Sequence, residues 1–234
     1  MNEFLIQNFF VLSYSIEFLA AITGLFYLKK FKSTAAESFI YFLIYAFLVD
    51  LLGGYPRYFR ILGLFEMLKG TVLERNYLWY TVFWGMGSAL FYVFFYNKIL
   101  KNDHRKRILN YAAVLFLIVA VLQLIFNYQS NSPQYRILIF VMGSLLILLC
   151  VSFYFIEILE NEKVLTFYKS IYFWISAIIL IWFLVTTPLL FYEIYFSTAD
   201  WNFILLKWQI YLFANMFMYL SFSFALLWCK PEND

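Results

Sequence analysis

Histidine, cysteine and proline are scarce in this chain, which limits the chemistry that it can support. The 234 residues include one histidine, two cysteines and four prolines. A single histidine without clustered cysteines argues against a zinc site. Cys150 and Cys229 make no disulfide framework and are expected to be small apolar side chains. No Ser-His-Asp set, phosphate-binding loop or glycine-rich dinucleotide turn is present. The sequence therefore predicts no catalytic set, no cofactor and no metal.

Charged residues are also scarce, and long apolar runs stand in their place. Hydrophobic residues make up 65% of the chain and charged residues 13%, whereas a soluble domain is nearer about half apolar and a quarter charged. Inside a bilayer, backbone polar groups must be paired within a helix or a closed barrel. Barrel strands alternate apolar and polar residues, and Val114 to Phe126 does not alternate. We therefore predict an all-α polytopic membrane protein.

Seven segments are long enough to cross a bilayer, which needs roughly 20 apolar residues per helix. The predicted helices lie at about residues 4–28, 35–55, 77–100, 108–128, 134–159, 167–195 and 201–228, in a single transmembrane domain over 1–234. In the longest connection, Ile61, Leu64 and Leu68 fall on one helical face and Arg60 on another. This pattern predicts a helix in the membrane interface over about residues 57–73. An irregular lid packed on the helix ends is the alternative.

Two of the predicted helices share a short sequence pattern. Ile40 to Ala46 in the second helix is similar to Ile171 to Ala177 in the sixth. Parallel repeats of three helices on either side of a fourth would explain this similarity. Chance within a narrow set of residue types is the simpler explanation.

Lysine and arginine are distributed unequally between the two sets of loops. About eleven lie on the side of the first, third and fifth interhelical loops and the C-terminus, and six on the other. Basic residues favour the cytoplasmic side. We therefore predict that the N-terminus lies outside and the C-terminus in the cytoplasm, as for a multi-pass protein of a bacterial inner membrane.

Glu17 is the most unusual polar residue, because it falls near the middle of the first predicted helix. A charge inside a bilayer is costly, so such a residue is a functional candidate by default. Its carboxyl group must be protonated, paired with a base or exposed to water. We predict either a proton, cation or ligand-amine site, or a neutral acid that donates a hydrogen bond to a neighbouring helix.

Asp50 is a second acidic candidate, in the outer part of the second predicted helix. Arg57 and Arg60 follow it, after the pair Gly53 and Gly54 and a proline that together predict a helix break. The three charged residues could bind an anionic ligand in an outward-facing pocket. A salt bridge that fixes the loop is the alternative.

Glu193 and Lys207 are the remaining ligand or ion candidates, near the outer ends of the sixth and seventh predicted helices. Glu193 or Asp200 is the expected partner of Lys207. Pro188 removes one backbone hydrogen bond from the sixth helix, so we expect a kink near Val185. The kink is either a hinge or a static bend.

The predicted cytoplasmic side has a cluster of charged residues that could contact lipid or a partner protein. Its basic members are Lys98, Lys101, Arg105, Lys106 and Arg107, and its acidic members are Glu157 and Glu160. Basic residues at a membrane surface attract anionic headgroups, but they also serve simply to orient the chain. The acidic residues could pair with the basic loop or dock a cytoplasmic partner. The loop is too short to predict nucleic-acid binding.

Three segments resemble a loose set of small bacterial inner-membrane proteins with seven predicted helices. They are Ile40–Gly53 (IYFLIYAFLVDLLG), Asn76–Asn97 (NYLWYTVFWGMGSALFYVFFYN) and Phe173–Leu180 (FWISAIIL). The resemblance covers about a third of the chain. It implies the seven-helix fold and a bacterial origin, and it implies no activity.

Three functions fit these features. The first is a non-enzymatic membrane module: a sensor, accessory subunit or membrane effector that assembles with itself or with a partner. The second is a small secondary transporter or ion channel that uses Glu17 and Asp50. The third, an intramembrane lipid-modifying enzyme, is the least favoured, because Asp50 and His104 are predicted to lie on opposite sides of the membrane.

Overall fold

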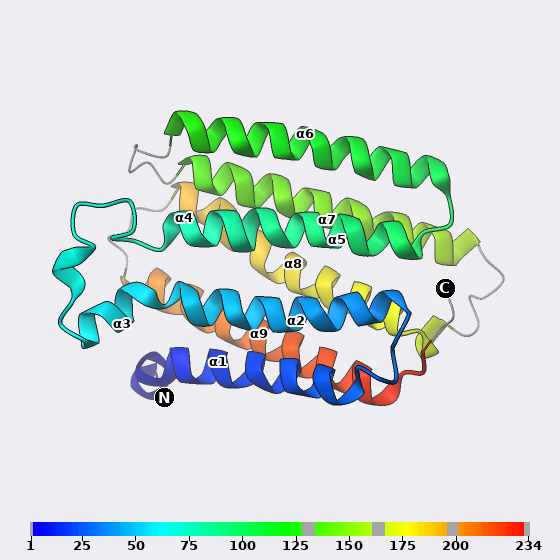
Figure 1. Cartoon of the computed structure of the whole chain (residues 1–234), viewed down its shortest axis with the longest axis horizontal. Helices are drawn as coiled ribbons and strands as arrows, with labels where there is room; N and C mark the ends of the chain where they lie inside the picture. Colours follow the sequence, from blue (N-terminus) through cyan, green and yellow to red (C-terminus); the bar gives the residue numbers. More distant parts are fainter. Residues whose placement is uncertain (1, 128–133, 161–166, 196–200, 232–234) are drawn as a thin grey trace.

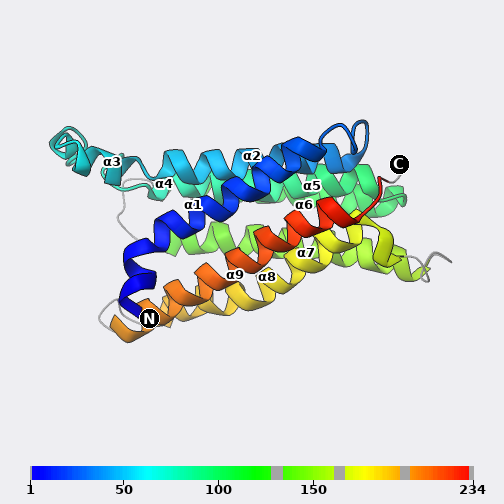
Figure 2. The same cartoon turned by 90° about the horizontal axis from the view of Figure 1, so that it is seen from below.

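The protein is an all-α membrane protein with seven helical spans that lie side by side (Figure 1). The computed structural model describes residues 2–127, 134–160, 167–195 and 201–231. Each span is long and apolar enough to cross a membrane, which confirms the prediction of a seven-helix, multi-pass protein. The N-terminus lies at the end of the bundle that has α3, and the C-terminus lies at the opposite end (Figures 1 and 2).

Six of the spans consist of one main helix, and the third span has three parts. The helices are α1 (Asn2–Tyr27), α2 (Ala35–Gly53), α3 (Tyr55–Ile61), α4 (Tyr77–Trp79), η2 (Tyr80–Met86), α5 (Gly87–Ile99), α6 (Asp103–Asn127), α7 (Gln134–Glu160), α8 (Ile171–Tyr195) and α9 (Trp201–Trp228), with short turns η1 (Phe65–Met67) and η4 (Phe167–Lys169). The segment η2 is a π-helix, and together with α4 and α5 it forms the third span. The sequence did not predict this change of helix type.

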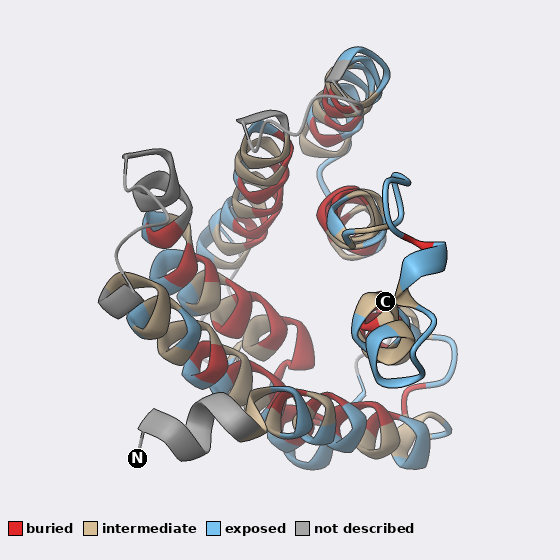
Figure 3. Ribbon diagram, turned by 90° about the vertical axis from the view of Figure 1, so that its left-hand side faces the viewer, coloured by how far each residue is buried: buried red, intermediate tan, exposed pale blue. Residues whose placement is uncertain are grey.

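Six spans form a closed ring, and α6 lies outside it. Around the ring, α1 contacts α2, and α2 contacts η2 and α5 of the third span, which in turn contact α7. The ring closes because α7 contacts α8, α8 contacts α9, and α9 contacts α1. In the described chain, the extensive contacts of α6 are with α5 and α7 alone. Figure 3 shows α6 on the outside of the bundle. The first three spans and the last three therefore have the same order of neighbours.

Buried residues line the inward side of the ring, and apolar residues also cover its outside (Figure 3). Phe39, Phe95 and Phe222 are fully buried, and the ring centroids of Phe222 and Phe95 lie 4.9 Å and 5.7 Å from that of Phe39. Ile118 and Leu122 of α6 are exposed. Apolar residues on both sides are what a helix needs when protein lies on one side and lipid on the other.

The connection between α2 and α4 is irregular, so the continuous interfacial helix expected over about residues 57–73 is not formed. Helical structure ends at Ile61, and only one short turn follows at Phe65–Met67. Gly63 and Gly70 have φ angles of 71° and 74°, a left-handed conformation that ends a helix. Ile61, Met67 and other apolar side chains remain exposed on this connection.

Glu157 fixes the opposite end of the bundle, the predicted cytoplasmic end. Its carboxylate accepts hydrogen bonds from the backbone N–H groups of Lys101 and Asn102, both at 2.9 Å. Arg105 lies 3.6 Å from Glu157 and 2.6 Å from Glu160. The two acidic residues thus pair with the basic loop inside the chain.

We expect Glu157→Ala to lower the free energy of unfolding by about 2–3 kcal/mol, because two backbone donors lose a charged acceptor. Glu157 is 8% exposed, whereas the side chain of Glu160 is 57% exposed. Glu160→Ala is the matched control and should cost less than about 1 kcal/mol. Unfolding followed by circular dichroism in micelles measures both, and equal losses would contradict this role of Glu157.

Candidate functional site

A cavity of about 860 Å³ lies within the helix ring. Its walls come from α2, the three-part third span, α7, α8 and α9. Pockets for small organic ligands typically occupy about 300–1,000 Å³. The cavity therefore has room for a metabolite-sized molecule.

The inner wall of the cavity is mostly aromatic, with a few fixed polar groups. Trp84 and Trp182 line it, and the indole N–H of Trp182 donates to the side-chain oxygen of Asn215 at 2.8 Å. Ser144 and Thr186 also line it, and each donates its hydroxyl proton to a carbonyl of its own helix, at 2.7 and 2.9 Å. Such hydroxyls keep acceptor lone pairs for a ligand.

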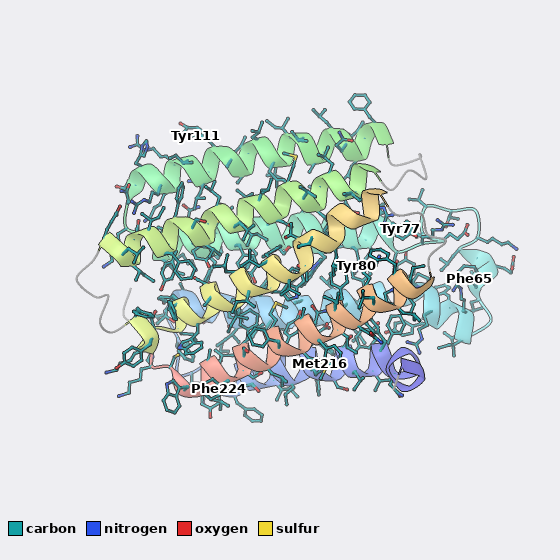
Figure 4. The ribbon with its side chains drawn as sticks, turned by 180° about the vertical axis from the view of Figure 1, so that it is seen from behind. Phe65, Tyr77, Tyr80, Tyr111, Met216 and Phe224 are labelled. Carbon is teal, nitrogen blue, oxygen red and sulfur yellow. The ribbon has the colours of Figure 1, made fainter. Side chains whose placement is uncertain are left out.

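The charged lining residues lie toward the end of the bundle that has α3. Asp50 is in the last turn of α2, Arg136 in the first turn of α7 and Lys207 near the start of α9. The guanidinium carbon of Arg136 lies 3.6 Å from the centroid of the Tyr77 ring. Figure 4 shows Tyr77 and Tyr80 at this end of the molecule.

Glu17 lies behind the cavity wall, with its carboxyl group against that of Asp50. The side chain is 1% exposed, and its two oxygens have no hydrogen-bond donor in good geometry among the described residues. The two carboxyl groups interact directly across the contact between α1 and α2. Two acids this close in a buried site cannot both ionise readily, so the pair is suited to hold a shared proton.

Four tyrosines surround this carboxyl pair. Tyr80 of η2 interacts with Asp50, and Tyr219 of α9 is close enough to both acids to interact with them electrostatically. Tyr14 of α1 lies beside Tyr58 of α3, whose hydroxyl donates to the carbonyl of Leu51 at 2.9 Å. Among the described residues, tyrosine hydroxyl groups therefore lie near Glu17 and Asp50, and no basic side chain forms an ion pair with either acid.

Gly53 and Gly54 allow these tyrosines to approach the backbone. A side-chain carbon on Gly53 would lie 2.8 Å from the Tyr80 hydroxyl, and one on Gly54 would lie 2.7 Å from the Tyr14 hydroxyl. The sequence indicated only a helix break at this pair. The break is small, since α2 ends at Gly53 and α3 begins at Tyr55.

The π-helix η2 sets which residues of the third span face the cavity. Tyr77 lines it before the π-helix, Tyr80 and Trp84 line it within the π-helix, and Ser88 lines it after the π-helix. The start of the span is fixed to the end of α2, because the Trp79 indole N–H donates to the Val49 carbonyl at 2.9 Å. π-Helical insertions occur frequently at functional sites.

The structure does not bring Arg57 and Arg60 to Asp50. Arg57 stacks on Phe10 with 4.5 Å between guanidinium carbon and ring centroid, and Arg60 stacks on Phe65 at 4.4 Å. Neither arginine is among the described residues that line the cavity. The basic residues that line the cavity beside Asp50 are instead Arg136 and Lys207.

The other predicted site residues are divided between the two ends of the molecule. Glu193 belongs to α8, but its side chain lies outside the described residues, as does Asp200. Pro188 lies inside α8, which continues through it. The candidates that were predicted to be cytoplasmic belong to the end of α5, the loop and the start of α6, and in the described part of the chain none of them lines the cavity: Lys98, Lys101, Arg105, Lys106 and Arg107.

Sequence reasoning missed Arg136, Tyr77 and Tyr80. Arg136 entered it only as one of the basic residues that set the orientation. The available signal was its place inside a predicted membrane helix, the criterion that singled out Glu17. Within the described ranges, no group of three histidine, cysteine or acidic residues is placed to hold a metal ion.

No family model, no curated protein and no solved structure matches this chain. The similarity to bacterial inner-membrane proteins therefore stays an expectation.

Proposed function

We propose that this protein is a proton-coupled secondary transporter for a small organic solute, with the central cavity as its solute site. The observation that supports this most strongly is the position of Asp50. Its side chain lines the cavity and also contacts Glu17, which is buried behind it. A solute in the cavity would therefore change the surroundings of a buried acid pair.

The arrangement of the helices also supports transport. Secondary transporters commonly have repeated helix bundles with the solute site between them. Here the first and the last three spans have the same order of neighbours, and the cavity lies between the two sets. The fourth span, α6, connects them from outside the ring.

A sensor or accessory module would need access to the cavity from one side only, whereas a transporter opens it to each side in turn. Cysteine labelling separates these possibilities without knowledge of the solute. Ser144→Cys places a thiol in the cavity wall, in a chain with Cys150→Ala and Cys229→Ala. Ser152→Cys, on an exposed position of the same helix, is the matched control, and we expect it to face lipid.

In proteoliposomes of known orientation, we expect a membrane-impermeant thiol reagent to label Ser144→Cys from both sides. Ser152→Cys should react little from either side, because thiols react as thiolates and need water. Labelling of Ser144→Cys from one side only would contradict transport and favour a sensor. No labelling from either side would contradict a solute site of any kind.

A further inference from the structure

Arg136 is the charged group in the cavity wall that most needs a counter-ion. It stacks on Tyr77 at 3.6 Å and makes no ion pair with any described residue. A cation at membrane depth needs a partner or water. The stacked guanidinium keeps its in-plane N–H groups available, and these can bind an acidic group with two parallel hydrogen bonds.

The chain itself does not supply this partner from the cavity wall. Asp50 is the one acidic residue that lines the cavity among those described, and its carboxyl group is occupied by Glu17 and Tyr80. Lys207 lines the same wall, but it already has an interaction partner within the chain, so Arg136 carries the argument. The charge distribution at this end of the cavity therefore favours a negatively charged ligand.

The rest of the cavity favours an apolar, flat molecular body. Trp84, Trp182 and Trp208 come from three different spans and line the wall together with Tyr92 and Phe140. Aromatic walls stabilise flat apolar groups through their area and ring geometry. A strongly hydrated inorganic anion would gain nothing from these walls.

We propose, resting on the transport function above, that the solute is an organic anion with an aromatic or bulky apolar body. Its acidic group binds Arg136, its body lies against the tryptophans, and one proton on Glu17 and Asp50 accompanies it. A soluble aromatic acid and an anionic lipid headgroup share this chemistry.

Charge balance is the reason why a proton is expected to accompany the anion. In the empty cavity, one proton shared by Glu17 and Asp50 leaves the pair with a single negative charge, which offsets Arg136. When a monoanion binds Arg136, a second proton taken from water neutralises the pair. The empty and the loaded form then have the same net charge at this site, which matters because an added charge is costly inside a bilayer. The hydroxyls of Tyr14, Tyr58, Tyr80 and Tyr219 are the groups that can relay the proton.

Three probes of equal size and different charge test the ligand class: phenylpropanesulfonate, phenylpropanol and phenylpropylammonium. Binding is measured by calorimetry on the full chain in nanodiscs of phosphatidylcholine, which has no net charge. We expect the sulfonate to bind best and the ammonium worst. Arg136→Gln should weaken binding of the sulfonate at least about tenfold, or roughly 1.4 kcal/mol, and leave phenylpropanol unchanged.

Arg75→Gln is the matched control for Arg136→Gln. Arg75 also stacks on Tyr77, at 5.6 Å, but it does not line the cavity in the described chain. Its loss should not affect any probe. Competition by phosphatidylglycerol added to the nanodiscs would assign the anion to a lipid headgroup, and lack of competition would assign it to a soluble acid.

The inference and the proposed function can fail separately. Three results would contradict an organic anion as the solute: tightest binding of the ammonium, equal effects of Arg136→Gln and Arg75→Gln, or no binding of any probe. Labelling of Ser144→Cys from both sides would still support transport in each of these cases. One-sided labelling together with selective sulfonate binding would overturn transport and keep the anion site.

Discussion

Asp50→Asn and Glu17→Gln are each expected to abolish accumulation of phenylpropanesulfonate driven by a pH gradient, with a loss of at least about tenfold. The amides have nearly the size of the acids but cannot exchange a proton. Both acids are buried or line the cavity, and each contacts the other. Removing either one therefore leaves the anion without its accompanying proton.

The same variants should retain exchange of labelled for unlabelled sulfonate across proteoliposomes. Exchange uses only the loaded form, which the neutral amide mimics, so it reports binding and movement without net proton transfer. A sulfonate is the suitable probe because, as a strong acid, it does not cross lipid in a neutral form. Glu66→Gln, with a side chain 78% exposed in the connection after α3, is the control and should accumulate solute normally. Normal accumulation in Asp50→Asn or Glu17→Gln would rule out the pair as the coupling site.

Deletion of Val82 is expected to abolish sulfonate binding while the protein still folds. The deletion removes one residue from the π-helix η2 and favours an ordinary α-helix through the third span. Because each α-helical residue turns the chain by about 100°, Tyr77 and Tyr80 would rotate away from the cavity relative to Trp84. Arg136 would then lose its stacking partner, and Asp50 would lose its tyrosine neighbour.

The span remains long enough to cross the membrane, since it has 23 residues and roughly 20 are needed. Val82→Ala is the matched control, because it removes side-chain atoms and keeps the helical phase. We expect Val82→Ala to bind the sulfonate within about threefold of the native chain. Calorimetry in nanodiscs measures both variants, and native affinity after the deletion would show that η2 does not position the site.

The seven-helix fold was predictable because it depends on hydrophobicity over long windows. Stretches such as Val114 to Phe126 allow only one secondary structure in lipid, and the structure has α6 there. The order of packing was not predictable. Helices that are apolar on all sides give no sign of which face meets protein, and the outside position of α6 depends on contacts between distant segments.

The candidate site was predictable only in part, for physical reasons. Glu17 and Asp50 stand out because ionisable residues are rare in membrane helices, but their contact joins two spans that sequence spacing cannot relate. The π-helix was hidden because its residues, Tyr80 to Met86, are as apolar as those of the α-helical turns beside them. In the connection after α2, the apolar spacing favoured a helix to residue 73, whereas the left-handed Gly63 ended it.

Arg136 was underestimated because basic residues near helix ends usually orient the chain. The structure places it against Tyr77 on the cavity wall instead. A basic residue in the first turn of a membrane helix is thus ambiguous in sequence, and only the neighbouring helices decide whether it faces water, lipid or a cavity.

The most direct test of the account is an infrared difference spectrum of the protein in nanodiscs, recorded with and without phenylpropanesulfonate. The probe has no carboxyl group, so any change in the protonated-carboxyl band belongs to the protein. We predict that binding adds intensity to this band in the native chain, and that Glu17→Gln and Asp50→Asn each abolish the change. Sulfonate binding without a change in this band would contradict the proposal that the cavity and the buried acid pair work as one site.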